Sequence, residues 1–214
     1  MNKLLILLII IISQNIFAQI DYLDEGNKYL NENKNIEAEK IFREAIKSDN
    51  SNLTYKCQLA LSLINQNKNA DAEIEIQEVL KKDSLNIGAL WYGGINNFLN
   101  KKTDFRKSAN YFEKAYPYIN KNSPQYFAVN FFIGKCYKNL LYTEGISYQE
   151  TDRMLETYKK YVELQPNAED ITETKKFIAK VESTRPPANV KIWVIATSEK
   201  QAYELVKQQV DTKK

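Results

Sequence analysis

The sequence predicts an all-α solenoid, a row of helical hairpins stacked one after another. The main observation is a segment that occurs twice, because residues 33–39 (NKNIEAE) return as residues 67–73 (NKNADAE). The ends of the two copies also match at the same separation, with IKSD at residues 46–49 and LKKD at residues 80–83. A fixed period of about 34 residues in a helix-rich sequence is typical of a helical-hairpin repeat protein.

The composition excludes several classes of function. The 214 residues are 43% hydrophobic and 27% charged, which suits one sizeable core or one short solenoid. The 30 basic and 27 acidic residues are interspersed, which indicates a solvated surface and no nucleic-acid interface. The sequence has no histidine, which removes the usual general base, histidine-containing triads and histidine metal sites. We therefore expect no catalytic residues, no metal and no cofactor.

The segment over residues 1–18 has the pattern of a cleaved signal peptide. Lys3 supplies the positive charge, residues 4–12 form an apolar block, and small Ala18 precedes the predicted cut, which leaves Gln19 first. The alternative is an uncleaved membrane anchor. A helix needs about 20 apolar residues to span a bilayer, and the apolar block over residues 4–12 is much shorter than that. We therefore expect export to the periplasm or the cell exterior, and no transmembrane span in the mature chain.

The first two repeats follow one plan. In the first helix Gly26 and Tyr29 stand three residues apart, so that a small residue admits the neighbouring helix and an aromatic ring fills the space beside it. A turn at residues 33–35 ends this helix. The second helix carries apolar residues at helical spacing, Ala38, Ile41, Phe42, Ala45 and Ile46. The second copy, residues 53–86, has the same pattern, with Leu59, Ala60 and Leu63 on its first helix and Ala72, Ile76 and Val79 on its second.

The third and fourth copies continue the plan with more variation. The fourth copy pairs a helix over Tyr126–Leu141 with one over Thr151–Leu164, and the insertion Leu141–Gln149 between them is expected to be a surface loop, although such insertions sometimes contact ligands. An amphipathic helix over Glu169–Glu182 is expected to cap the array. The third copy places the following residues on its two helices: Leu90, Trp91, Gly94 and Phe98, then Phe105, Ser108, Phe112 and Ala115.

This arrangement resembles the tetratricopeptide repeat (TPR) family, and more narrowly its secreted bacterial members. The resemblance rests on the small residue, the aromatic three positions later, the turn, the Ala-x3-Phe-x2-Ala pattern and the polar or proline stop. It covers Gln19–Ser183, so we predict a signal peptide over 1–18, a TPR solenoid over 19–183 and an appendage over 184–214. The resemblance implies a right-handed superhelix whose first helices line a concave groove that binds a peptide or protein partner.

The phase of the first helices predicts which residues face that groove. Aromatic side chains are good anchors for a partner, and side-chain amides bind an extended peptide backbone. The alternative is that aromatics such as Trp91 and Phe131 only pack between repeats. The predicted groove residues are Asn27, Asn31, Gln58, Asn65, Trp91, Tyr92, Phe131, Phe132, Lys135 and Asn139.

One subgroup of the family binds a C-terminal carboxylate through lysine, arginine and asparagine side chains, and this sequence departs from it. Asn27 matches one of those positions, but Gln58 replaces the second asparagine, and Gly88 and Tyr92 occupy the basic positions. We therefore expect no carboxylate clamp.

The two cysteines do not suggest a disulfide. Cys57 and Cys136 lie on first helices two repeats apart, farther than the Cα separation of about 7 Å that a disulfide allows. We predict that both are small core residues.

The C-terminal appendage does not fit the repeat. Pro186 and Pro187 end the preceding helix, and Val190–Thr197 is rich in β-branched residues around Trp193, which favours a strand. Ser198 is placed to cap a last helix that would run to Gln209. A lone strand leaves its backbone unpaired, so the segment is either helical or pairs with something outside this chain.

These features together predict a non-catalytic scaffold for protein–protein interaction, exported to the cell envelope. Its partner is a protein or peptide bound in the concave groove. One alternative is a self-assembling structural subunit that associates through Val190–Thr197. A third, less favoured because no paired acids mark a cleft, is an accessory to an envelope enzyme.

Overall fold

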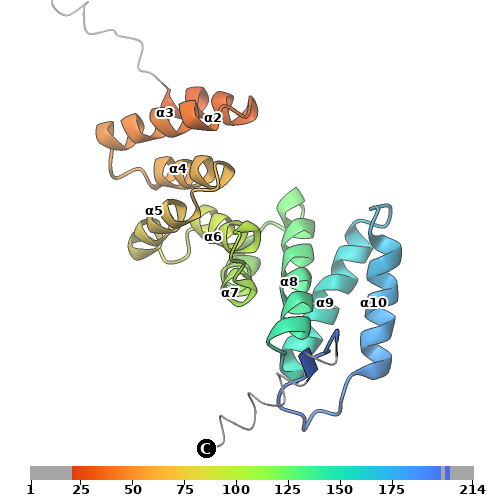
Figure 1. The fold of residues 1–214 in the computed structure, drawn as a ribbon. Coiled ribbons are helices and arrows are strands. Elements are labelled where there is room, and N and C mark those ends of the chain that lie inside the picture. The colour runs from red at the N-terminus through yellow and green to blue at the C-terminus, as the bar shows by residue number, and fades with distance from the viewer. Residues whose placement is uncertain (1–20, 199–200, 203–214) are drawn as a thin grey trace, which may run out of the picture. The chain divides into compact units, whose positions relative to one another are not determined.

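The computed structural model describes residues 21–198 and 201–202, and this part of the chain holds nine α-helices and one 3₁₀ turn (Figure 1). The predicted signal peptide and most of the predicted helix from Ser198 to Gln209 lie outside the described residues. No described helix is long and apolar enough to cross a bilayer. The helices are α2 (Tyr22–Asn31), α3 (Asn35–Ser48), α4 (Leu53–Asn65), α5 (Asn69–Lys82), α6 (Ile87–Leu99), α7 (Phe105–Ala115), α8 (Pro124–Thr143), α9 (Tyr148–Leu164) and α10 (Ile171–Thr184), with η1 (Tyr116–Tyr118) between α7 and α8.

The chain divides into two compact units, with the boundary between Glu75 and Ile76 inside α5. In the first unit, α2 and α3 form a hairpin that a missing side chain makes possible. A Cβ atom at Gly26 would lie 2.3 Å from the ring of Phe42, which is completely buried. The close approach of the two helices therefore requires glycine at this position.

The repeated NKN segment marks a repeated turn. Asn33 and Asn67 both have a φ of 59°, in the left-handed region that asparagine tolerates better than most residues. The next residue in each copy donates its backbone N–H to the helix just completed, from Lys34 to Tyr29 O and from Lys68 to Leu63 O, each at 2.9 Å. The repeated sequence therefore ends both helices with the same backbone geometry.

A carboxylate on α3 ties this helix to the turn after α4. Glu39 accepts hydrogen bonds from Lys68 Nζ at 2.7 Å, Gln66 Nε2 at 2.9 Å and Arg43 Nε at 2.9 Å. Burial alone would raise the pKa of Glu39, but these three donors outweigh it and lower the pKa from 4.5 to about 2.

We predict that Glu39→Gln destabilises the chain in a pH-dependent way. A carboxyl whose pKa is depressed on folding adds stability above its unfolded pKa and loses it as the pH falls through its folded pKa. The variant should lose about 1–2 kcal/mol of unfolding free energy at pH 7. Urea denaturation should show this gap closing between about pH 4.5 and pH 2. A gap that stays constant over that range would contradict the assignment.

The second unit repeats the same hairpin closure twice. A Cβ at Gly94 would lie 2.5 Å from the ring of Phe112, and one at Gly134 would lie 2.8 Å from the ring of Tyr158. Phe112 and Tyr158 are almost completely buried, so neither ring can move aside without disturbing the core. The hairpins α6–α7 and α8–α9 thus have the construction of α2–α3.

Ser108 stands where the first two repeats have Ala38 and Ala72, and its hydroxyl makes two hydrogen bonds. Its Oγ donates to Gly94 O at 2.8 Å and accepts from the thiol of Cys136 at 3.3 Å. Cys136 and Cys57 are both buried, and no disulfide joins these two described residues, as the sequence predicted. Burial also raises the pKa of the Cys136 thiol to about 12, which keeps it protonated at neutral pH.

The insertion in the fourth repeat is mostly helical, so the expected surface loop is wrong for most of its length. Helix α8 runs on to Thr143 and α9 already begins at Tyr148, which leaves only residues 144–147 between them. Ile146 in this short connection is completely buried. The added residues therefore lengthen α8 and place an apolar side chain in the core.

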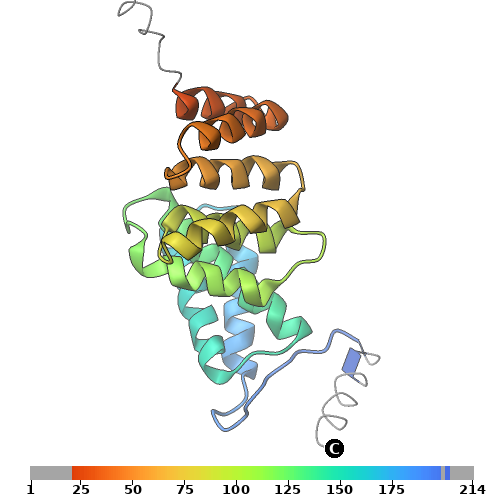
Figure 2. The same ribbon diagram turned by 90° about the vertical axis from the view of Figure 1, so that its left-hand side faces the viewer.

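The appendage folds back on this connection. After α10 the chain returns to the α8–α9 junction (Figures 1 and 2), where Trp193 forms one antiparallel bridge with Ile146. The expected strand is thus an extended segment with a single bridge within the described residues. The expectation of pairing outside the chain is wrong for this bridge, because the other half of it is Ile146.

We predict that Gly94→Ala destabilises the chain although alanine favours helices over glycine. Overpacking against Phe112 lowers the unfolding free energy by about 1–3 kcal/mol, whereas the higher helix propensity of alanine raises it by at most about 1 kcal/mol. Gly88→Ala is the matched control, since this glycine of the same helix lines an open pocket and should give equal or higher stability. Urea denaturation followed by circular dichroism measures both. Equal stability of Gly94→Ala and Gly88→Ala would contradict the packing account.

Candidate functional site

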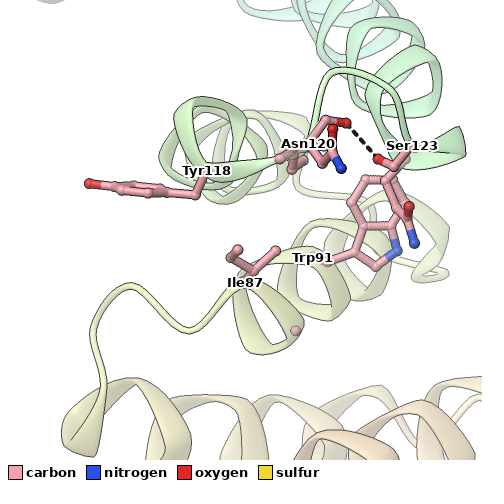
Figure 3. Close-up of a pocket in the computed structure, with 8 residues that line it drawn as sticks. Ile87, Trp91, Tyr118, Asn120 and Ser123 are labelled. Atoms are coloured by element: carbon pink, nitrogen blue, oxygen red, sulfur yellow. Dashed lines mark hydrogen bonds between the residues drawn. The ribbon is translucent and has the colours of Figure 1, made fainter.

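A pocket of about 340 Å³ opens in the second unit, between the first turns of α6 and the connection from α7 to α8 (Figure 3). Ile87 and Trp91 form one side, and Tyr118, Asn120 and Ser123 stand across from them in the figure. A volume near the lower end of the range for ligand sites suits one or two side chains of a partner. The lining residues are Ile87, Gly88, Trp91, Tyr118, Ile119, Asn120, Ser123 and Gln125.

Local sequence signals fix both walls. Asn86 caps α6, because its side chain accepts the backbone N–H of Ala89 at 3.1 Å. In the opposite wall, Asn120 accepts the N–H of Asn122 on its side chain at 2.9 Å and the hydroxyl of Ser123 on its carbonyl at 2.7 Å. Proline at residue 124 starts α8 without needing a backbone donor. The pocket is therefore built into the fold.

The indole of Trp91 is supported from behind by two rings. Its centroid lies 5.5 Å from that of Phe112 and 6.1 Å from that of Phe132, both in edge-on arrangements. These two phenylalanines stack on each other at 5.1 Å with an interplanar angle of 8°. Trp91 itself is only half-buried, so one face of a firmly held ring remains available.

The chemistry of the lining favours an uncharged apolar group. Ile87 is 43% exposed and Tyr118 is 51% exposed, which is high for such large apolar side chains. The polar groups are the amides of Asn120 and Gln125, the hydroxyls of Ser123 and Tyr118 and the indole N–H of Trp91, and none of the described residues that line the pocket is a carboxylate, lysine or arginine. Amides beside an apolar hollow suit an apolar side chain flanked by peptide backbone.

The other predicted groove residues of the second unit lie on α6 and α8. Phe132 is a packing residue, because its ring also lies 5.2 Å from that of Phe98. Phe131 contacts the ring of Tyr161 at 5.0 Å and lies 5.1 Å from the ammonium of Lys135. The remaining two are Tyr92, which is half-buried, and Asn139, which donates to Lys135 O at 2.7 Å.

The four predicted residues of the first unit have mixed surroundings. Asn65 is exposed at the end of α4 and donates to Asn35 Oδ1 at 2.9 Å, so it belongs to the turn network. Asn27 and Gln58 are half-buried, and Asn31 is exposed. A role for these four in partner binding remains a prediction.

Sequence reasoning missed most of the pocket. It placed Trp91 correctly at a first-helix position and considered Gly88 only as a substitute for a basic residue. The far wall comes from the connection between repeats, whose path was not predicted. The available signal was the pair Pro117 and Pro124, which bracket a short, rigid segment with exposed Tyr118.

The described residues contain no group of three or more histidine, cysteine, aspartate or glutamate side chains that could hold a metal ion. A charge cluster around Arg153 in the second unit has a structural role. Arg153 pairs with Glu113 at 2.9 Å and Glu156 at 2.9 Å and lies over the ring of Tyr116. The guanidinium charge of Arg153 is therefore balanced by carboxylates on α7 and α9.

The fold defines the chain as an all-α, TPR-like helical repeat protein. Among solved structures it is similar to MamA. One crystal structure of MamA gives a TM-score of 0.58 at 16% identity over 89% of this chain and 92% of that chain, and a MamA mutant gives 0.61 at 16% identity over 87% and 96%. No protein-family model matches the sequence, and no curated protein matches it. At 16% identity the similarity supports the fold alone, so the function is inferred from the pocket.

Proposed function

We propose that this protein is a non-catalytic scaffold of the TPR family that binds an extended segment of a partner protein. The observation that carries the proposal is the preformed, uncharged pocket beside Trp91, whose apolar walls remain partly exposed. An apolar or aromatic side chain of the partner enters this pocket as an anchor. The amides of Asn120 and Gln125 hydrogen-bond to the backbone beside it.

The anchor explains only part of the affinity. Burial of one large apolar side chain contributes about 1.5–3 kcal/mol, which is too little for a stable complex without further contacts. Further contacts come from first-helix residues that the repeat phase predicts to face the groove, including Tyr92, Phe131 and Asn139. This division into one deep anchor and many weaker contacts is the usual arrangement in protein interfaces.

The binding proposal is tested by filling the pocket. We predict that Gly88→Leu reduces the affinity for peptides selected from a random display library on the unmodified chain by at least tenfold, about 1.4 kcal/mol. The leucine side chain occupies the pocket, and it favours the helix over glycine, so the fold should be retained. Isothermal titration calorimetry measures the affinity.

Gly88→Ala is the matched control for this experiment. It adds a single carbon at the same position and should leave most of the pocket open and the affinity within about threefold, less than about 1 kcal/mol. Unchanged binding by Gly88→Leu, with circular dichroism matching that of Gly88→Ala, would refute the pocket as the anchor site.

We also propose that the scaffold works outside the cytoplasm, in the periplasm or at the cell exterior. The proposal rests on the basic, apolar and small-residue pattern over residues 1–18. We predict that the chain recovered from a bacterial envelope fraction begins at Gln19, which Edman sequencing or intact mass measures. Recovery of the chain with Met1 intact in the cytoplasm would contradict export. Lys3→Glu, which removes the positive charge, should slow processing.

A further inference from the structure

The extended segment over residues 192–196, which has a bend at each end, has two backbone edges, and one of them is already paired. Trp193 donates its N–H to Ile146 O at 2.8 Å and accepts from Ile146 N at 2.9 Å. Ile195 donates to Leu141 O at 2.8 Å on the same side. The inner edge of the segment is therefore fixed to the end of α8 and the connection that follows it.

The outer edge has no such partner in the described part of the chain. Backbone groups alternate between the two sides of an extended chain, so those of Ile192, Val194 and Ala196 point away from Ile146. No hydrogen bond within residues 21–198 and 201–202 engages the N–H or C=O of Ile192 or Val194. Ile192 is also 52% exposed.

The surrounding residues hold this edge in place. A Cβ at Gly145, whose φ is +84°, would lie 2.5 Å from Ile192, so the segment packs directly on a glycine. Arg106 fixes the same connection, since it donates to Gly145 O at 3.1 Å and pairs with Glu144 at 3.0 Å and Glu150 at 2.6 Å. An edge that is ordered before binding loses little conformational entropy when it pairs.

The composition of the edge is that of a pairing strand. It is rich in β-branched residues, and Lys191 is the single charge between Val190 and Thr197. Monomeric proteins usually protect such edges with several charges, proline or a covering element.

We propose that this edge pairs with the same edge of a second copy of the chain, in an antiparallel arrangement with a two-fold axis at Val194. In that register Val194 faces Val194 of the other copy, Ile192 faces its Ala196, and Ala196 faces its Ile192. Each of these three pairs exchanges two hydrogen bonds, so every outer backbone group of the three residues is satisfied. The interface is self-complementary, as two-fold symmetry requires.

Two copies can pair in this register without charge repulsion. The two copies of Lys191 do not face each other, because each lies three residues from the two-fold axis at Val194, on opposite sides of it. Like charges directly opposite would oppose pairing, and none occur. Three residue pairs bury a small area, so we expect a weak dimer with a dissociation constant of about 1–100 μM.

The proposal is tested on the purified chain by sedimentation velocity over that concentration range. The expected result is a rise from the monomer mass to twice that mass. Val194→Pro removes an N–H of the outer edge and leaves the inner hydrogen bonds intact, so it should remain monomeric. Val194→Thr is the matched control, because it keeps the N–H and the β-branch, and it should dimerise. A monomer at every concentration, or a dimer that survives Val194→Pro, would overturn the proposal.

A second variant tests the register and covers the case in which proline disturbs the fold. Facing residues of a hydrogen-bonded antiparallel pair have Cα atoms about 5.5 Å apart, within the range of a disulfide. Val194→Cys should therefore form a covalent dimer under mild oxidation, whereas Lys191→Cys should not. The native Cys57 and Cys136 are buried and leave the background low. Equal cross-linking of the two variants would rule out the two-fold axis at Val194.

Discussion

The ring of Phe112 is the contact on which the second unit depends. On one side it fills the space that Gly94 leaves by having no side chain, which closes the third hairpin. On the other side it stacks on Phe132 of the next repeat, and its edge supports Trp91. One buried side chain therefore closes a hairpin, joins it to its neighbour and fixes the wall of the pocket. Because the support lies in the core, the pocket does not have to form when a partner arrives.

Much of this fold could be predicted from the sequence because its determinants are local and periodic. The sequence predicted that the small residue of a first helix admits the neighbouring helix, and the structure adds that the aromatic ring in contact comes from the second helix, Phe42 at Gly26 and Phe112 at Gly94. The repeated asparagine turn was visible as well, since a left-handed residue is needed wherever the first helix must end sharply.

The parts that could not be predicted depend on where the chain goes between repeats. Tyr118 and Asn120 line the pocket only because a short turn brings them opposite α6, and no periodic pattern marks that path. The β-branched segment around Trp193 was recognised, but its partner Ile146 lies far earlier in the chain, in an insertion that looked like a loop. Local composition indicates a preference for extended structure and contains no information about the residue with which it pairs.

The scaffold account reduces to one claim, that the hollow beside Trp91 receives an apolar side chain from an extended partner. A crystal structure of the chain with a display-selected peptide tests this claim most directly. The account predicts the peptide's apolar side chain against Trp91 and Ile87, with its backbone within hydrogen-bonding distance of Asn120 or Gln125. A peptide bound on another surface, with this pocket empty, would contradict it.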